Sequence, residues 1–354
     1  MNVLKTLSLL VIFAISTATS SFAFETDQYN LPTARLGDIG TEVSSYFEEN
    51  LIAAIDEVNR EIDKLTRCMA NGGKRDGACP SPSDARRLLN DAHGDDAVGR
   101  ALFKRIGDGS MFITKTGKWF RDHRFVASPA SYQVPYADSI YYFKPSNQLT
   151  LSPTIKMFDI EFGTDKIEHL LQQGWTYYEI RRAELANGKT PADADKKATE
   201  WGKLSERTYY GLMSSGVYSN ADLAANYAGM RFYEGMTRPL QLNGLMRPAI
   251  LELHDGHWRI APNVDLPSTL LKPFISEHLN EAVNPSGYAF FVYPTVKRVV
   301  RTRACPEWKS FVSKTTKADL AQRSALLEKW NSEDYGFATK GRRVTIGDSC
   351  FDRK

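Results

Sequence analysis

The chain has 354 residues, of which 42% are hydrophobic and 25% are charged, which is the composition of a globular protein with one large domain or two ordinary ones. The formal net charge is only +3 and no long run of Lys and Arg occurs, so nucleic acid is not expected as a partner. Beyond the N-terminus, no stretch is long and apolar enough to predict a transmembrane segment.

The N-terminus has the pattern of a secretory signal peptide, which we predict over residues 1–23. Lys5 supplies the positive charge, residues 7–15 form a short apolar run, and Ala23 ends a cleavage site of small residues. An uncleaved membrane anchor is the alternative, although the apolar run is short for a bilayer. The pattern predicts a secreted protein, periplasmic in a Gram-negative bacterium, with no transmembrane segment after cleavage.

The first mature segments are predicted to be helical. Apolar residues spaced by threes and fours run through residues 36–65 and indicate one long amphipathic packing helix. Residues 81–104 look helical too, with a break at His93 and Gly94. Short aromatic segments then suggest strands over residues 107–143, with a turn at Thr116 and Gly117.

The four cysteines favour disulfides, because such cysteines are typical of an oxidising compartment. Cys68 and Cys79 bracket a glycine-rich loop, and Cys305 and Cys350 both lie in the last third of the chain. We prefer the pairs Cys68–Cys79 and Cys305–Cys350 among the three connectivities. A metal site built on cysteines is the weaker alternative, since no C-x-x-C motif occurs.

Three central helices are predicted next. The first begins with Thr164 as N-cap and ends near Asn187, and the second opens at Thr190 before a proline and runs to about Met213. The third begins at Ser219, which forms an S-x-x-D capping box with Asp222.

The remainder of the chain, residues 241–354, is predicted to be a smaller α+β region packed on a helical domain of residues 24–240. Asp255 and Gly256 indicate a two-residue hairpin turn. The flanking His254 and His257 are weighed as metal ligands and judged more typical of an exposed hairpin. Helices are expected over residues 272–282 and 318–330, with a loop and strand between them. The fold class is therefore mainly α, α+β overall, with a bundle made by the long N-terminal helix and the central three-helix unit.

The candidate site consists of polar residues at helical spacing in the central unit, namely Asp165, His169, Glu206, Asp222 and Asn226. Asp165 and His169 are four apart and so share a helix face, where the carboxylate is expected to orient the imidazole as a general base. Glu206 is then the acid. The same pattern suggests a divalent metal held by some of Asp165, His169, Glu206 and Asp222. Capping residues and a satisfied core histidine explain each feature without function.

The order of these residues resembles the VanZ-like superfamily and related envelope proteins of Gram-negative bacteria. The pattern D-K-x-x-H, then Glu, then S-x-x-D-x-x-x-N-x-x-G covers roughly residues 160–235. The matching residues are Asp165, Lys166, His169, Glu206, Ser219, Asp222, Asn226 and Gly229. The resemblance implies a helical bundle with an internal polar cluster at the cell envelope. VanZ-like proteins are membrane-embedded, whereas the helices predicted here carry charged segments that cannot sit in lipid.

Two hypotheses follow from this pattern. In the first, the polar residues hydrolyse an envelope component by metal-assisted or His/Glu acid–base chemistry, with His169 as base or ligand. In the second, the chain is a non-enzymatic structural or ligand-binding protein, and the same residues form a buried hydrogen-bond network. The partner is an envelope component or a small molecule in either case, and the sequence predicts no oligomeric state.

Overall fold

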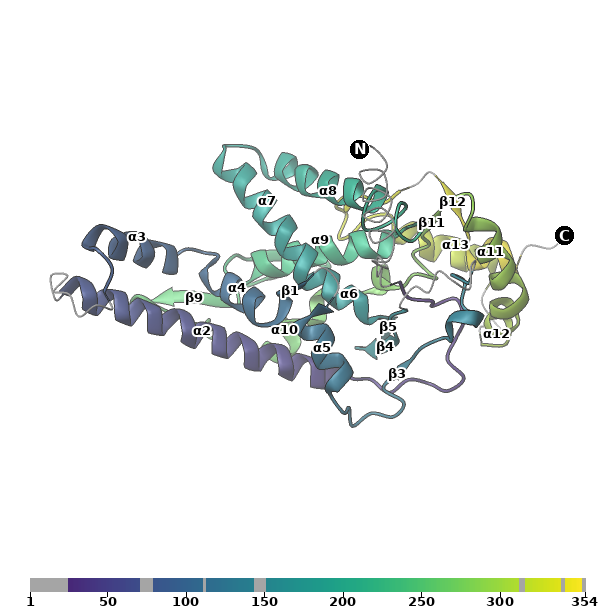
Figure 1. Cartoon of the computed structure of the whole chain (residues 1–354), viewed down its shortest axis with the longest axis horizontal. Helices are drawn as coiled ribbons and strands as arrows, with labels where there is room; N and C mark the ends of the chain where they lie inside the picture. Colours follow the sequence, from purple (N-terminus) through teal and green to yellow (C-terminus); the bar gives the residue numbers. More distant parts are fainter. Residues whose placement is uncertain are drawn as a thin grey trace, which may run out of the picture.

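The computed structural model describes residues 25–70, 79–110, 113–142, 151–311, 316–338 and 341–351. Within these ranges the fold is mainly α with short antiparallel sheets, as predicted (Figure 1). The predicted signal peptide, residues 1–23, lies outside the described residues. Across the ranges just given, no helix combines the length and the apolar character needed to cross a membrane.

Helices occur throughout the described ranges. They are α2 (Gly40–Ala70), α3 (Pro82–Ala92), α4 (Ala97–Leu102), α5 (Lys115–Asp122), α6 (Thr164–Glu168), α7 (Gly174–Ala186), α8 (Pro191–Arg207), α9 (Asn220–Gly235), α10 (Leu266–Thr269), α11 (Tyr293–Val299), α12 (Cys305–Phe311), α13 (Lys317–Leu326) and α14 (Ile346–Cys350). Wider π-helical turns extend some of them, namely η1 (Phe103–Gly107), η3 (His169–Gln173) and η6 (Val300–Ala304). Single 3₁₀ turns are η2 (Tyr136–Asp138), η4 (Lys272–Phe274) and η5 (Glu277–Leu279).

The strands are short and pair antiparallel in small sheets. They are β1 (Gly109–Ser110), β2 (Ile113–Thr114), β3 (Ser131–Tyr132), β4 (Thr154–Met157), β5 (Ile160–Gly163), β6 (Val217–Tyr218), β7 (Leu240–Leu242), β8 (Leu245–Arg247), β9 (Leu251–His254), β10 (His257–Ile260), β11 (Gly287–Tyr288) and β12 (Arg342–Arg343). Two sheets matter for the site. The sheet β3-β4-β5 leads directly into α6, and the sheet β12-β11-β6 leads into α9.

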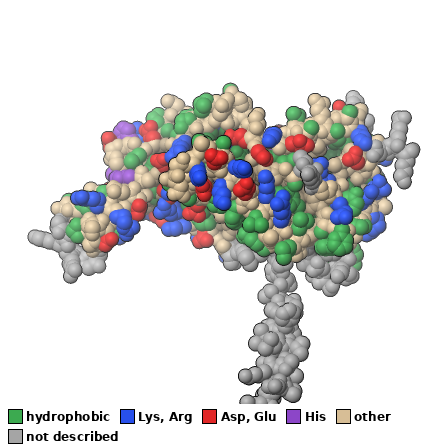
Figure 2. All heavy atoms as spheres, turned by 90° about the horizontal axis from the view of Figure 1, so that it is seen from above, with side chains coloured by type: hydrophobic (Ala, Val, Ile, Leu, Met, Phe, Trp, Pro, Cys, Tyr) green, Lys and Arg blue, Asp and Glu red, His purple; other side chains and the backbone are tan. Residues whose placement is uncertain are grey.

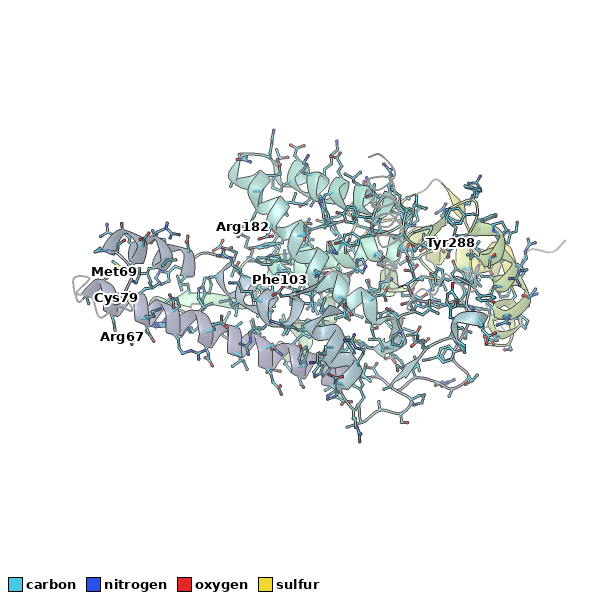
Figure 3. All side chains as sticks on the ribbon, in the orientation of Figure 1. Arg67, Met69, Cys79, Phe103, Arg182 and Tyr288 are labelled. Atoms are coloured by element: carbon cyan, nitrogen blue, oxygen red, sulfur yellow. A yellow bond between two sulfur atoms is a disulfide. The ribbon has the colours of Figure 1, made fainter. Side chains whose placement is uncertain are left out.

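The long helix α2 is confirmed, and it runs along one edge of the molecule (Figure 1). Its buried stripe includes Val43, Phe47 and Leu51, which are fully buried. The Cys68–Cys79 disulfide closes the end of α2, and Figure 3 shows Cys79 near the tip of this arm, with Tyr288 at the opposite end of the molecule. The second predicted disulfide, Cys305–Cys350, joins α12 to α14.

The predicted turn at Thr116 and Gly117 is wrong, because both residues belong to the first turn of α5. The side chain of Thr114 accepts a hydrogen bond from the backbone N–H of Gly117 at 2.8 Å and so caps this helix. Threonine is a favoured N-cap residue, so Thr114 marks the start of a helix here. The break at His93 and Gly94 is confirmed, since α3 ends before it and α4 begins after it.

The central three-helix unit is confirmed as α6-η3-α7, α8 and α9, with three corrections at its ends. Thr164 is not the N-cap of α6, because Gly163 takes that position and Thr164 is the first helical residue. The helix α8 ends at Arg207 rather than near Met213. After Arg207 the chain turns back, and the carbonyl oxygen of Glu206 accepts from the N–H of Leu212 at 2.8 Å. Ser219 caps α9 as predicted. Asp222 does not complete the capping box, because its carboxylate accepts from Lys166 of α6 instead.

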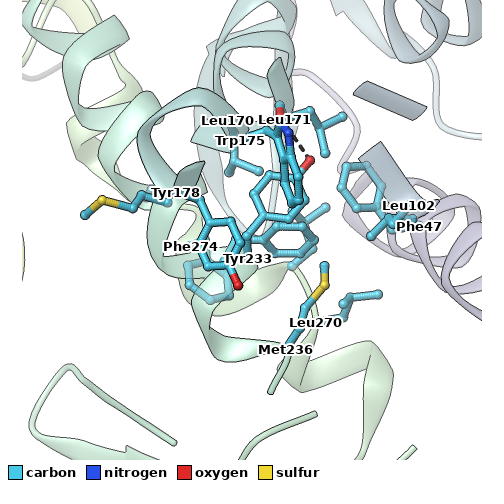
Figure 4. Close-up of a cluster of buried hydrophobic side chains, with 14 of the residues drawn as sticks. Phe47, Leu102, Leu170, Leu171, Trp175, Tyr178, Tyr233, Met236, Leu270 and Phe274 are labelled. Atoms are coloured by element: carbon cyan, nitrogen blue, oxygen red, sulfur yellow. Dashed lines mark hydrogen bonds between the residues drawn. The ribbon is translucent and has the colours of Figure 1, made fainter. Parts of the chain in front are cut away.

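The helix α9 is the centre of the fold, and every residue from Asn220 to Gly235 is buried. Gly229 lies so close to the first helix that a β-carbon there would be 1.9 Å from the carbonyl oxygen of Leu170. The absence of a side chain at Gly229 is therefore what lets the neighbouring helix approach. Further along the same contact, Tyr233 packs with Trp175 and Tyr178, and Phe47 approaches from α2 (Figure 4).

The C-terminal region departs from prediction in two segments. The hairpin at Asp255 and Gly256 is confirmed, and both residues have the positive φ angles, 48° and 78°, that a two-residue turn requires. The helix expected over residues 272–282 is instead the separate turns η4 and η5. The helical conformation ends at Asn280, because its side-chain oxygen accepts hydrogen bonds from the N–H groups of Ala282 and Val283. Part of the strand expected after residue 284 is instead the helix α11, which has a proline in its first turn.

Two hydrophobic clusters fill the interior. The larger one contains buried residues from Ile39 to Tyr335 and so draws on both sides of residue 240. This packing does not test the predicted domain boundary near Leu240, which stays a prediction. The smaller cluster surrounds Tyr29, Tyr288 and Val296 at the opposite end of the molecule. On the face shown in Figure 2, basic and acidic side chains are interspersed.

Candidate functional site

The centre of the candidate site is the side chain of Lys166, which is 0% exposed. Its Nζ atom lies 2.5 Å from Oδ2 of Asp165, 2.5 Å from Oδ1 of Asp222 and 2.7 Å from Oε1 of Glu281. Burial lowers the pKa of Lys166, but the attraction of these carboxylates outweighs burial and holds the pKa well above its usual value. The cluster therefore contains a permanent buried ammonium that joins α6, α9 and the segment after η5.

Hydroxyl groups from distant segments hold the carboxylates around this lysine. Thr26 donates to Oδ1 of Asp165 at 2.7 Å, and Ser219 donates to Oε1 of Glu281 at 2.7 Å. The hydroxyl of Ser286 donates to the other oxygen of Glu281. The first described residues of the chain are thus part of the site, because Thr26 reaches it directly.

The predicted pairing of Asp165 with His169 is not what the structure has. The two carboxylate oxygens of Asp165 bind Lys166 and Thr26 instead. Side chains on a helix tilt toward its N-terminus, so an aspartate in the first turn points beyond the start of α6. Asp165 therefore belongs to the lysine cluster and does not orient the imidazole.

His169 is oriented by two residues of α9. Its Nδ1 atom lies 3.0 Å from the side-chain oxygen of Asn226, an acceptor that places the ring hydrogen on Nδ1. Its Nε2 atom lies 3.4 Å from Oδ2 of Asp222. The side chain of His169 is 18% exposed, whereas those of Lys166 and Asp222 are 0% and 6% exposed. Of these three side chains, His169 is the one that reaches the surface.

Glu206 is brought to the same cluster, as predicted, and it carries an unpaired atom. Its Oε2 accepts from the backbone N–H of Ser219 at 3.1 Å, while its buried Oε1 has no hydrogen-bond partner. The hydroxyl of Tyr177 on α7 is buried in the same region, where the side chain of Asn226 is its polar neighbour. Gly202 on α8 makes space for this tyrosine, because a β-carbon there would lie 1.5 Å from the hydroxyl oxygen. Unpaired buried polar atoms are rare in proteins and mark positions where water or a ligand binds.

Asp222 and Glu206 are two buried carboxyl groups with opposite protonation behaviour. Burial and the negative charge of Asp222 raise the pKa of Glu206 well above its usual value. Burial also raises the pKa of Asp222, but the positive charge that His169 carries when it is protonated, together with that of Lys166, outweighs burial and leaves the pKa lowered. The surroundings therefore favour the ionised form of Asp222 and the protonated form of Glu206. Such separation of two carboxyl groups is typical of acid–base sites.

Glu25 is a further buried carboxyl group beside the cluster. Burial and the charges of Asp222 and Glu281 raise the pKa of Glu25 well above its usual value, and its Oε2 atom has no hydrogen-bond partner. A protonated Glu25 adds no negative charge to the carboxylates that already surround Lys166. A protonated Glu25 limits the negative charge of the cluster, in which Asp165, Asp222 and Glu281 already outnumber the single cation Lys166.

The hypothesis of a divalent metal held by Asp165, His169, Glu206 and Asp222 has no geometric support. Among the residues that the structure describes, no group of three or more His, Cys, Asp or Glu side chains is arranged to hold a metal ion. The ammonium of Lys166 occupies the position between the carboxylates that a cation would need. His254 and His257 are apart from this region, and His257 pairs with Asp63 of α2 at 2.9 Å.

A separate ion-pair ring lies on the other face of α9. Arg181 and Arg231 each contact both Asp195 and Glu234, at distances between 2.5 and 2.8 Å, so that α7, α8 and α9 are joined in a closed ring. Arg231 also reaches Glu333 at 2.9 Å. All four groups of the ring are paired, which is typical of a structural network.

Sequence reasoning placed all five candidate residues in one region but missed the centre of the site. Lys166 was recognised only as part of the D-K-x-x-H pattern, although its position one turn before the buried Leu170 was a signal for burial. Tyr177 lies in an aromatic stretch of the sequence, where nothing marks it as a site residue. Glu281 and Glu25 lie far from the motif in sequence, and no local pattern marks them.

Comparison with known proteins gives no relative: no family model, no curated protein and no solved structure matches the chain. The resemblance to the VanZ-like superfamily therefore stays a prediction.

Proposed function

We propose that the cluster is an acid–base site that hydrolyses a component of the cell envelope, in the periplasm of a Gram-negative bacterium. The observation that carries the proposal is the opposite displacement of the pKa values of Asp222 and Glu206 beside a histidine that reaches the surface. A relationship to the VanZ-like superfamily is part of the proposal. It is supported by the meeting of the motif residues Asp165, Lys166, His169, Asp222 and Asn226 in one cluster.

The base in this mechanism is Nε2 of His169. Asn226 fixes the ring hydrogen on Nδ1, which leaves the lone pair of Nε2 free to take a proton from water. The oxygen of that water forms the new bond to the substrate. Asp222, 3.4 Å from Nε2, then stabilises the imidazolium that has formed.

The acid is Glu206, whose protonated form is favoured by burial and by the negative charge of Asp222. When the substrate bond breaks, the leaving group takes this proton, and the proton gained by His169 later restores Glu206. The Oε1 atom of Glu206, which has no hydrogen-bond partner among the described residues, is the partner that a polar atom of the substrate or a bound water would take. Lys166 stays charged throughout and keeps Asp222 ionised.

The proposed location is supported by three features of the chain. Residues 1–23 have the signal-peptide pattern, and the two disulfides fit an oxidising compartment. None of the helices in the described ranges could span a membrane. A periplasmic protein would meet the polymers of the envelope directly, which is why we propose an envelope component as the substrate.

A second candidate function is a purely structural one, and one observation favours it. The cluster joins the first described residues, α6, α8, α9 and the segment 281–286, so it fastens together parts of the chain that are far apart in sequence. A buried polar network of this kind can serve to fix a single arrangement of the helices.

The experiment that tests the proposal incubates the purified protein with isolated peptidoglycan and with outer-membrane polysaccharide. Soluble fragments are measured by mass spectrometry for the wild type, His169→Gln and Glu206→Gln. Loss of a general base or acid is expected to slow fragment release by about 10²–10⁴-fold. His257→Gln, an exposed histidine on the hairpin, is the matched control and should leave the rate unchanged. Equal release by His169→Gln, or no release by the wild type from either polymer, would argue for the structural function.

A further inference from the structure

Two segments without acidic residues lie side by side at the end of the molecule that holds the smaller hydrophobic cluster. Residues 207–218 and 287–306 contain no Asp or Glu. Strand β6 of the first segment pairs with strand β11 of the second, with Gly287 opposite Tyr218. The N–H of Ala289 donates to the carbonyl of Gly216 at 2.8 Å, which extends the contact beyond the strands.

Large hydrophobic side chains project from both segments. Phe290 is 70% exposed, Met213 is 78% exposed and Tyr209 is 53% exposed. The ring of Phe290 meets the edge of Phe291 at 5.4 Å between centroids, which makes this part of the surface a continuous aromatic group. We name Tyr209, Met213 and Phe290 the apolar patch.

Basic side chains follow the apolar patch on the neighbouring helix. The two segments contain five basic residues and no acidic one, namely Arg207, Lys297, Arg298, Arg301 and Arg303. Arg303 forms an ion pair with Asp138, so its charge is compensated. Lys297, Arg298 and Arg301 line one shallow hollow along α11 and η6, beside Tyr293. On the face that Figure 2 draws, basic and acidic side chains are interspersed. The two adjoining segments differ, because the charged residues within them are all basic.

We propose that this surface docks on an anionic lipid bilayer. Exposed aromatic and long aliphatic side chains beside Lys and Arg are the combination by which proteins bind at a membrane interface, where the apolar groups enter the headgroup region and the cations face lipid phosphates. Met213 and Phe290 are the inserted groups, and Lys297, Arg298 and Arg301 are the phosphate contacts. Charge complementarity selects anionic lipid over a second copy of the chain, since two copies would bring like charges together.

This inference does not depend on the proposed catalysis, because none of the five residues belongs to the cluster around Lys166. Docking would place the chain on a membrane face whether or not the site is an enzyme. The two proposals can therefore fail separately.

The test is co-sedimentation of the full mature chain with lipid vesicles. Vesicles of phosphatidylglycerol mixed with phosphatidylethanolamine should carry the protein down, and vesicles of phosphatidylcholine alone should not. Each of Arg298→Gln and Arg301→Gln should weaken binding about five-fold, and high salt should weaken it further. The double variant Met213→Ser/Phe290→Ser should no longer sediment.

Leu326→Ser is the matched control, because Leu326 is also 70% exposed but lies on α13 outside the patch. It should bind like the wild type. Near-ultraviolet circular dichroism confirms that each variant keeps its fold. The proposal is overturned by equal binding to both kinds of vesicle, by no binding to either, or by a double variant that binds like the wild type. It is also overturned if light scattering shows a dimer that Phe290→Ser dissociates, since the patch would then be a contact between copies.

Discussion

Lys166 and Asp222 meet at 2.5 Å across the contact between α6 and α9, with the lysine fully buried and the aspartate 6% exposed. This pair joins the two halves of the candidate site. It supplies the positive charge that holds the surrounding carboxylates, and it keeps Asp222 ionised beside His169. The behaviour of the whole cluster follows from this one buried cation.

Replacing Lys166 by methionine should therefore be strongly destabilising. The variant leaves Asp165, Asp222 and Glu281 buried without their cation, and breaking a buried ion pair in this way costs about 3–5 kcal/mol. Urea-induced unfolding measures the loss. Lys197→Met, on the exposed face of α8, is the control and should change the unfolding free energy by less than about 0.5 kcal/mol. A similar small change for Lys166→Met would show that the lysine is not buried among the carboxylates.

Glu206 should make stability fall as pH rises. Its pKa is raised in the folded chain, so the folded state keeps a proton that the unfolded carboxyl releases above its usual value of 4.5. The unfolding free energy then decreases with rising pH, from about that value up to the raised pKa. Glu206→Gln cannot titrate, so its stability should fall less steeply than that of the wild type as the pH rises above the usual carboxyl value of 4.5.

The measurement is the unfolding free energy at several pH values across that range. Glu200→Gln, an exposed glutamate on the same helix, is the control and should keep the wild-type slope. Identical slopes for Glu206→Gln and the wild type would contradict a raised pKa at this carboxyl.

Gly229→Ala should disturb the contact between α9 and the first helix of the central unit. The added β-carbon would lie 1.9 Å from the carbonyl oxygen of Leu170, and a backbone atom cannot move aside as a side chain can. We expect a cost of at least about 1–3 kcal/mol in thermal or chemical unfolding, as for other overpacked interiors. Gly347→Ala is the control, because its nearest neighbours would be at 3.7 Å. If both substitutions are tolerated equally, the close approach is not present in solution.

The helices of this fold are easier to predict from the sequence than the helix ends and the turns are. The period of α2 and the caps at Thr190 and Ser219 depend on local contacts, which is why they were predictable. The end of α8 and the broken segment after residue 272 depend on hydrogen bonds between side chain and backbone, as at Asn280, and helical periodicity does not reveal them.

Five residues of the candidate site were predictable as a group, but their contacts and the other members of the site were not. Spacing correctly gathered Asp165, His169, Glu206, Asp222 and Asn226 because they lie on helix faces that pack together. Spacing also suggested that Asp165 orients His169, whereas Asp222 and Asn226 from another helix do so. Long-range partners such as Thr26 and Glu281 arise only when distant segments fold against each other.

The most direct test of the central claim is the unfolding free energy of His169→Gln, measured beside its rate of polymer hydrolysis. An acid–base site predicts lost hydrolysis together with stability equal to or above that of the wild type, since functional sites are commonly built at some cost to stability. A loss of about 1–3 kcal/mol, as expected when a buried network loses a partner, in a chain whose wild type hydrolyses neither polymer would contradict the claim and leave the cluster as a structural one.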